Sequence, residues 1–189
     1  VRMLIDDAAD FQRDRQIAAL AAHPRIEIRV YNPFYTRGML DFMRYAEFIV
    51  SGQRVNFRMH NKTFVADNAA AILGGRNIGD EYFQASDHTE FGDFDVLAVG
   101  PVVREISASF DGYWNSSLAI PIQALLAAKP SQETLQQYRD EIAQNRALLA
   151  ESPYARQLSK TKPLTSAMGD GRSLVWARAA LLYDSPDKS

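Results

Sequence analysis

The stretch HNKTFVADNAAAILGGRN, residues 60–77, decides the fold. It combines residues that can do chemistry with the pattern of two short strands joined by a turn. Apolar runs flank Asp67 and Asn68, and an aspartate–asparagine pair is a strong turn signal. The pattern predicts a hairpin over residues 57–74, with NFRMHNKTFVAD as the first strand and AAAILGG as the second. Gly74 and Gly75 then let the backbone turn tightly, because no side chain is in the way.

Side chains alternate between the two faces of a strand, so residues two apart point to the same side. We therefore expect His60 and Lys62 to project together, which places a nucleophile or proton carrier beside a permanent cation. Asp67 lies at the turn, where its carboxylate can accept backbone N–H bonds. Asn77 is expected on the same rim as His60. Lys62, Asn77 and nearby backbone N–H groups would then form an anion cradle the size of one phosphate.

The first part of the chain predicts a strand, a helix and a second strand. VRMLID is an apolar strand, and DDAADFQRDRQIAALAA has apolar residues near helical spacing. RIEIRVY alternates with period two and predicts the second strand. About 20 residues between the strands correspond to a βαβ crossover, which predicts an α/β fold with a mixed central sheet flanked by helices.

The remaining pattern completes one predicted domain over residues 1–189. We expect helices at residues 38–49 and 102–116, a strand in GDFDVLAVG, a helix capped by Ser131, and a strand followed by a turn in SLVWARAALLYDSPDKS. VRMLID reads as a strand already under way, so we expect the chain to be a piece of a longer one. The aromatic stretch at residues 34–48 would line an acyl-chain groove or pack in the core.

Composition narrows the possible functions. The net charge is -2 and the pI is about 5.9, whereas nucleic-acid-binding domains usually exceed a pI of about 9. There is no cysteine, so thiolate nucleophiles and disulfides are excluded. A zinc ion would depend on carboxylates and three histidines, and no pair of these has a familiar ligand spacing.

The residues that follow His60 match the motif of the phospholipase D superfamily, H-x-K-x4-D-x6-G-[GS]-x-N. Every position is filled, in order, by His60, Lys62, Asp67, Gly74, Gly75 and Asn77. Beyond the motif, GGRNIGDEYF and DFDVLAVGPVVREISASFDGYWNS resemble the N-terminal half of the bacterial C-type cardiolipin synthases. The resemblance implies a phospholipase D-like domain.

The resemblance also implies a two-step phosphatidyl transfer that needs no metal or cofactor. One histidine attacks phosphorus to form a phosphohistidine, and the histidine of a second motif protonates the leaving alcohol. Lysine and asparagine stabilise the charge on the phosphoryl oxygens, and we assign Gly75 and Arg76 to substrate binding. A carboxylate on a later strand holds the other nitrogen of the attacking histidine. Asp93 is the candidate, Asp95 shares its face as a reserve, and Asp80 and Glu81 are weaker candidates.

The sequence departs from the family pattern because it holds one H-x-K motif instead of two. Neither His23 nor His88 has a lysine two residues on. We therefore expect half an active site, completed by a downstream domain or by the mate in a homodimer, and little activity from the isolated chain. The expected substrate is a phosphatidylglycerol-like phospholipid, and no nucleic acid is expected to bind. We expect the protein to associate peripherally with the cytoplasmic side of a bacterial inner membrane.

Two alternatives stay open at this stage. A phospholipase or nuclease of the same superfamily would pass the phosphoryl group to water instead of to an alcohol. A non-catalytic half-domain would bind lipid or phosphate without turning it over. The acidic pI argues against a nuclease, and the GGRNIGDEYF run favours a synthase.

Overall fold

The computed structural model describes residues 1–7, 14–34, 57–77, 92–126, 129–152, 155–156, 159–160 and 174–186. The chain divides into two compact units. The first comprises Val1–His60, Ser107–Glu141 and Tyr183–Ser189, and the second comprises Asn61–Ile106 and Ile142–Leu182. The single domain expected over residues 1–189 stays a prediction.

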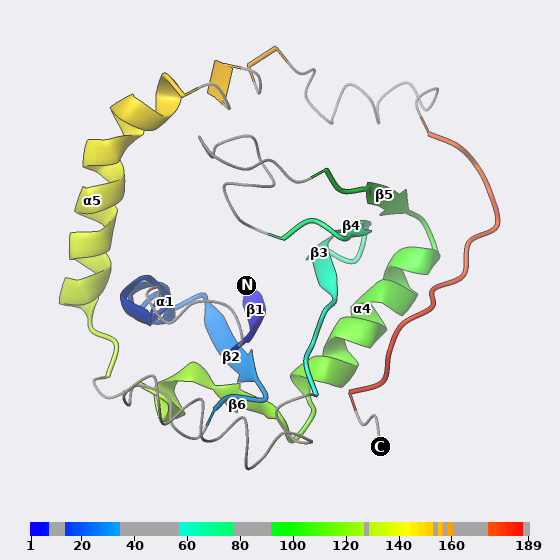
Figure 1. Cartoon of the computed structure of the whole chain (residues 1–189), viewed down its shortest axis with the longest axis horizontal. Helices are drawn as coiled ribbons and strands as arrows, with labels where there is room; N and C mark the ends of the chain where they lie inside the picture. Colours follow the sequence, from blue (N-terminus) through cyan, green and yellow to red (C-terminus); the bar gives the residue numbers. More distant parts are fainter. Residues whose placement is uncertain are drawn as a thin grey trace. The chain divides into compact units, whose positions relative to one another are not determined.

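The first unit contains a mixed three-stranded sheet. Strand β1 (Arg2–Asp6) pairs in parallel with β2 (Glu27–Tyr31), and β2 pairs antiparallel with β6 (Ala119–Pro121), as Figure 1 shows. Helix α1 (Asp14–Ala21) makes the connection between the two parallel strands, as the sequence predicts. The core of this unit is built on three fully buried side chains: Ile28, Val30 and Ile122. The predicted α/β class and the βαβ crossover are therefore confirmed.

The second unit contains an antiparallel sheet in the order β3 (Lys62–Ala66), β4 (Ala70–Gly74), β5 (Asp95–Val99). Alternate residues of this sheet, such as Val65 and Leu73, pack against a buried cluster of Ala71, Val103 and Ile106. Val103 and Ile106 belong to helix α4 (Val102–Trp114), which follows β5 directly. The period-two pattern of the hairpin therefore arises from one face that meets α4.

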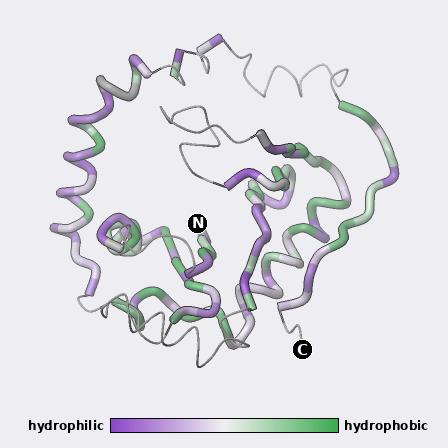
Figure 2. The backbone as a smooth tube through the Cα atoms, in the orientation of Figure 1, coloured by the Kyte–Doolittle hydropathy of each residue, from purple (hydrophilic) through white to green (hydrophobic). Residues whose placement is uncertain are grey.

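The remaining described elements are a 3-10 turn, η3 (Ile122–Ala124), and helix α5 (Gln132–Ala150). The Ser131 hydroxyl accepts a hydrogen bond from the backbone N–H of Thr134 at 3.1 Å, which confirms the predicted cap. Figure 2 shows that α5 is mostly hydrophilic, in keeping with its exposed side chains at residues 139–146. Its first turn is fastened by Gln132, whose side chain donates to the carbonyl of Ala22 at 2.8 Å.

Two strand predictions need correction, and one helix prediction lies outside the described residues. The first hairpin strand begins at Lys62, so His60 precedes it instead of lying within it. Residues 174–186 are extended but form no strand in the described part of the chain, and the Val175 and Leu182 side chains are exposed. The predicted helix at residues 38–49 lies outside the described residues.

Candidate active site

Two motif residues of the second unit, Lys62 and Gly74, lie at the open end of the β3–β4 hairpin. Lys62 pairs with Gly74 across the two strands, and Gly74 pairs with Asp95 on the third strand. Directly paired residues share a face, so Lys62 and Asp95 lie on the same side of the sheet with a glycine between them. The chain continues from Gly74 towards Asn77 at this same end of the hairpin.

Asp67 lies at the opposite end, in the hairpin turn. Asp67 and Asn68 have φ angles of 52° and 54°, and the N–H of Ala69 donates to the Ala66 carbonyl at 2.9 Å. This is a turn with two left-handed residues, which aspartate and asparagine tolerate well. Asp67 is five residue steps from Lys62 along the strand, a distance of about 16 Å at roughly 3.3 Å per residue. Asp67 therefore lies in the hairpin turn, as the sequence predicts, and its role in the motif stays a prediction.

Replacing Asp67 by valine is expected to destabilise the hairpin by about 1–2 kcal/mol, because a β-branched residue resists the left-handed conformation. Asp67→Gly is the matched control, since glycine adopts that conformation freely and should cost much less. Urea denaturation of the two variants measures the difference. Equal loss of stability in both would show that the carboxylate, and not the backbone conformation, is what matters at this position.

The two glycines of the motif make room for two carboxylates. A Cβ atom added at Gly75 would collide with the Asp93 carboxylate, and one added at Gly74 would collide with an Asp95 carboxylate oxygen. The same Gly74 Cβ would meet the Phe94 carbonyl oxygen, which is backbone. The Gly-Gly pair is therefore required by the close approach of residues 93–95, and not by a left-handed turn.

Asp95 pairs with Arg76. Arg76 Nε lies 2.8 Å from Asp95 Oδ2, an ion pair in which the N–H is not aligned as a hydrogen bond. The backbone N–H of Arg76 points to Asp95 Oδ1 at 3.4 Å, and the N–H of Gly75 donates to the Phe94 carbonyl at 3.3 Å. These two N–H groups are therefore directed at Asp95 and Phe94, and the anion cradle stays a prediction.

Asp93 lies before β5 and not within it. Its carboxylate accepts a hydrogen bond from the N–H of the next residue, Phe94, at 2.8 Å. Aspartate commonly competes with strand formation in this way. The orientation of a histidine by Asp93 stays a prediction, as does the substrate-binding role of Arg76. Asp80 and Glu81 lie outside the described residues.

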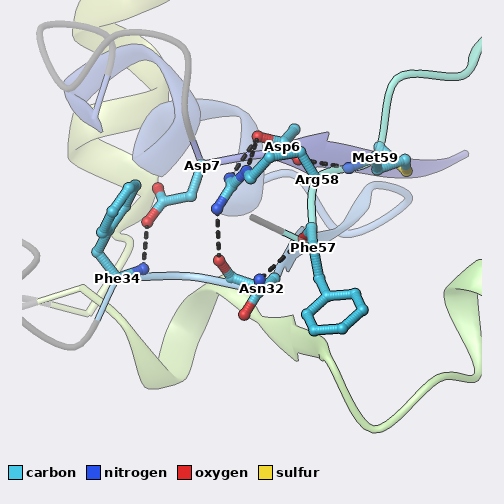
Figure 3. Close-up of polar contacts among 7 residues, drawn as sticks. All are labelled: Asp6, Asp7, Asn32, Phe34, Phe57, Arg58 and Met59. Atoms are coloured by element: carbon cyan, nitrogen blue, oxygen red, sulfur yellow. Dashed lines mark hydrogen bonds and ion pairs between the residues drawn. The ribbon is translucent and has the colours of Figure 1, made fainter. Parts of the chain in front are cut away.

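His60 is exposed and is the last residue of the first unit, whereas Lys62 and Asn77 belong to the second. The three residues before His60 bond to the carboxyl ends of β1 and β2 (Figure 3). Sequence reasoning missed the partners, Asp6 and Asn32. The available signal was a polar residue at the end of each parallel strand, Asp6 as the last residue of β1 and Asn32 directly after β2. The carboxyl ends of such strands commonly form binding sites in α/β sheets.

Neither a metal cluster nor a membrane span is found in the part of the chain that the structure describes. No three histidine, cysteine or carboxylate side chains lie together there in a way that could hold a metal ion. No helix in those ranges is long and apolar enough to cross a bilayer.

The mixed α/β fold, in which the motif residues from Lys62 to Gly74 lie on a hairpin, is consistent with a phospholipase D-like domain. Comparison with known proteins finds relatives among the cardiolipin synthases. The chain is 36% identical over all of its 189 residues to cardiolipin synthase C of Escherichia coli, at that protein's N-terminal part. It is 40% identical over 72 residues, 36% of the chain, to cardiolipin synthase A of Pseudomonas entomophila. The predicted resemblance to the cardiolipin synthases is confirmed.

These similarities have a limited extent. The chain spans 38% of the length of the Escherichia coli synthase and 15% of the Pseudomonas protein. A Helicobacter pylori protein of strain J99 is 40% identical over 129 residues, 68% of the chain and 25% of that protein. No family model matches the chain. No solved structure matches it either.

Proposed function

We propose that this chain supplies one of the two halves of the active site of a phosphatidyltransferase that acts on phospholipid phosphodiesters. The observation that carries the proposal is the complete motif, with Lys62 and the Gly74–Asn77 segment at one end of a hairpin and an exposed His60 two residues before Lys62. The 36% identity to a cardiolipin synthase over the whole chain supports phospholipids as the substrate class.

In the proposed reaction His60 is the nucleophile. A ring nitrogen of His60 forms a bond to phosphorus, and the bond from phosphorus to the headgroup oxygen breaks. The leaving alkoxide takes a proton from the histidine of the second half-site. That histidine then removes the proton of an incoming alcohol, whose oxygen attacks phosphorus and releases His60. Lys62 and Asn77 stabilise the negative charge on the phosphoryl oxygens.

The second half-site comes from further sequence of the same protein or from a second copy of the chain. His23 and His88 do not supply it, because neither is followed by a lysine two residues on. We propose that the protein meets its substrate by peripheral contact with the bacterial inner membrane, because phosphatidylglycerol-like substrates reside in the bilayer. Phosphatidylglycerol is the proposed phosphatidyl acceptor, and it or a second phospholipid is the donor.

The test is to incubate the full-length protein with vesicles that contain phosphatidylglycerol and to separate the lipid products by chromatography. Formation of cardiolipin supports a transferase. Phosphatidic acid without cardiolipin would replace the transferase by a hydrolase of the same superfamily. If neither product forms, or if His60→Ala leaves the yield unchanged, the proposed catalytic role is wrong and a lipid-binding role becomes the better account.

A further inference from the structure

Three consecutive residues immediately before His60 are each bonded to the ends of the two parallel strands (Figure 3). The Phe57 carbonyl accepts a hydrogen bond from Asn32 Nδ2 at 2.8 Å. Arg58 Nε donates to Asp6 Oδ1 at 2.9 Å, and the Met59 N–H donates to Asp6 Oδ2 at 2.8 Å. The backbone that leads into His60 is therefore held without belonging to a strand.

Asp6 holds both a side chain and the backbone of the next residue. Its Oδ1 accepts from Nε and Nη2 of Arg58, while its Oδ2 is taken by the Met59 N–H. Arg58 Nη1 also donates to the Asn32 carbonyl at 3.1 Å. A guanidinium can make these bonds together because its donors form a rigid planar fork, whereas a lysine ammonium is a single point charge on a flexible stem.

The residues around Arg58 at the end of β2 are also fixed by hydrogen bonds and burial. Asn32 is 1% exposed and has a φ of 45°, a left-handed conformation that asparagine tolerates. The buried Asp7 carboxylate accepts from the Phe34 N–H at 2.8 Å. The Phe34 ring lies 5.3 Å from the Arg58 guanidinium carbon, within range of a cation–π contact. Arg58 is therefore held between the ends of β1 and β2, which belong to the sheet.

We propose that Asp6, Arg58 and Asn32 are positioning residues that set the backbone of His60 for attack on phosphorus. The inference rests on the proposed function of His60. An attacking atom must lie close to its target in the correct direction, and a misplacement of about 1 Å can cost about 100-fold in rate. Because no strand ladder fixes residues 57–60, the bonds from Asp6 and Asn32 take over that task.

The experiment compares Arg58→Lys, Asn32→Gly and a control in the full-length protein, with phosphatidylglycerol vesicles as substrate. Arg58→Lys keeps the charge but loses the fork, so kcat should fall about 100-fold with KM nearly unchanged. Asn32→Gly keeps the left-handed backbone and removes the bond to Phe57, so kcat should fall about 10-fold. The control is Asp111→Asn, which breaks the 2.7 Å Arg2–Asp111 ion pair of the same unit and should leave kcat near the unsubstituted value.

An unchanged kcat in Arg58→Lys would overturn the positioning role. A raised KM with an unchanged kcat would do the same, because it would mean that Arg58 contributes to substrate binding. If Arg58→Lys fails to fold, Asn32→Gly tests the positioning role instead. An unchanged kcat in that variant, with or without a raised KM, would overturn it. A loss of kcat in Asp111→Asn as large as in Arg58→Lys would also contradict the proposal, because any weakened ion pair of the unit would then have that effect.

Hydrogen exchange of the Met59 amide separates this inference from the proposed function. If the unsubstituted protein transfers no phosphatidyl group, the proposed function fails. The exchange rate of the Met59 amide then still tests whether Arg58 and Asp6 fix residues 57–59. If the Met59 amide exchanges slowly in the unsubstituted protein and fast in Arg58→Lys, Arg58 fixes the segment. Equal exchange rates in the two proteins would show that it does not. If transfer occurs and Met59 exchanges equally fast with or without Arg58, the positioning inference fails while the proposed function stands.

Discussion

Replacement of His60 by asparagine is expected to lower the rate of phosphatidyl transfer by at least about 10,000-fold, as removal of an enzymic nucleophile commonly does. Asparagine is close to histidine in size and polarity, but its amide cannot form the bond to phosphorus. His60 is exposed, so the exchange should leave stability almost unchanged. Single-turnover formation of lipid product by the full-length protein measures the effect.

His23→Asn is the matched control for this loss. His23 lies between α1 and β2, where its Nδ1 accepts a hydrogen bond from the Arg25 N–H at 3.1 Å, and an asparagine oxygen can accept a similar bond. Its transfer rate should stay within about twofold of the unsubstituted protein. Comparable losses in the two variants would mean that the His60 result reflects general damage and not a missing nucleophile.

Replacement of Gly74 by alanine should reduce the free energy of unfolding by about 3 kcal/mol, the upper end of the usual cost of overpacking. The added Cβ would collide with the Phe94 carbonyl oxygen and would lie 2.8 Å from Asp95 Cα. Both atoms are backbone, so relief requires the β4–β5 ladder to separate. Urea denaturation measures this loss, and transfer activity should fall with it because Lys62 pairs with Gly74.

Two other glycines provide a graded comparison. At Gly92 nothing lies within 4 Å of an added Cβ, so Gly92→Ala should change stability by less than about 0.5 kcal/mol. At Gly75 the atoms met belong to the Asp93 side chain, which can rotate away, so the cost should be intermediate. If Gly74→Ala were as stable as Gly92→Ala, the close approach of β5 to the motif would be wrong.

Much of the fold was predictable because its signals are local. Alternation in RIEIRVY, the turn formed by Asp67 and Asn68, and the cap at Ser131 each predict a structure that is found. These features depend on neighbours in the sequence, so a single chain suffices to recognise them. The helix–strand order and the parallel pairing of β1 with β2 followed from the same signals.

The errors arose where side-chain carboxylates bind backbone N–H groups that a strand was expected to use. The period-two rule extended the first hairpin strand back through His60, but the Met59 N–H bonds to Asp6, which is 53 residues away in the sequence. Asp93 was expected within a strand, yet its carboxylate caps the N–H of Phe94. Periodicity describes side-chain faces and does not tell which acceptor a backbone N–H finds.

The candidate site also has features that the sequence predicted and features that it did not. The motif located Lys62, Gly74 and Asn77 through their spacing, and the register of the hairpin places Lys62 and Gly74 at one end. The reason for two consecutive glycines, the carboxylates of Asp93 and Asp95, was not visible in the spacing. The positioning role that we propose for Asp6 was likewise hidden, because it requires knowing which side chain reaches the end of β1.

The central claim is that His60 carries the phosphatidyl group covalently, and trapping this species tests it most directly. The full-length protein would be mixed with phosphatidylglycerol, quenched within the first turnover and digested under alkaline conditions that preserve phosphohistidine. We predict an acid-labile phosphorus adduct on the peptide that contains His60, absent from His60→Asn and present in His23→Asn. Lipid transfer at the normal rate with no adduct at His60 at any quench time would contradict the account.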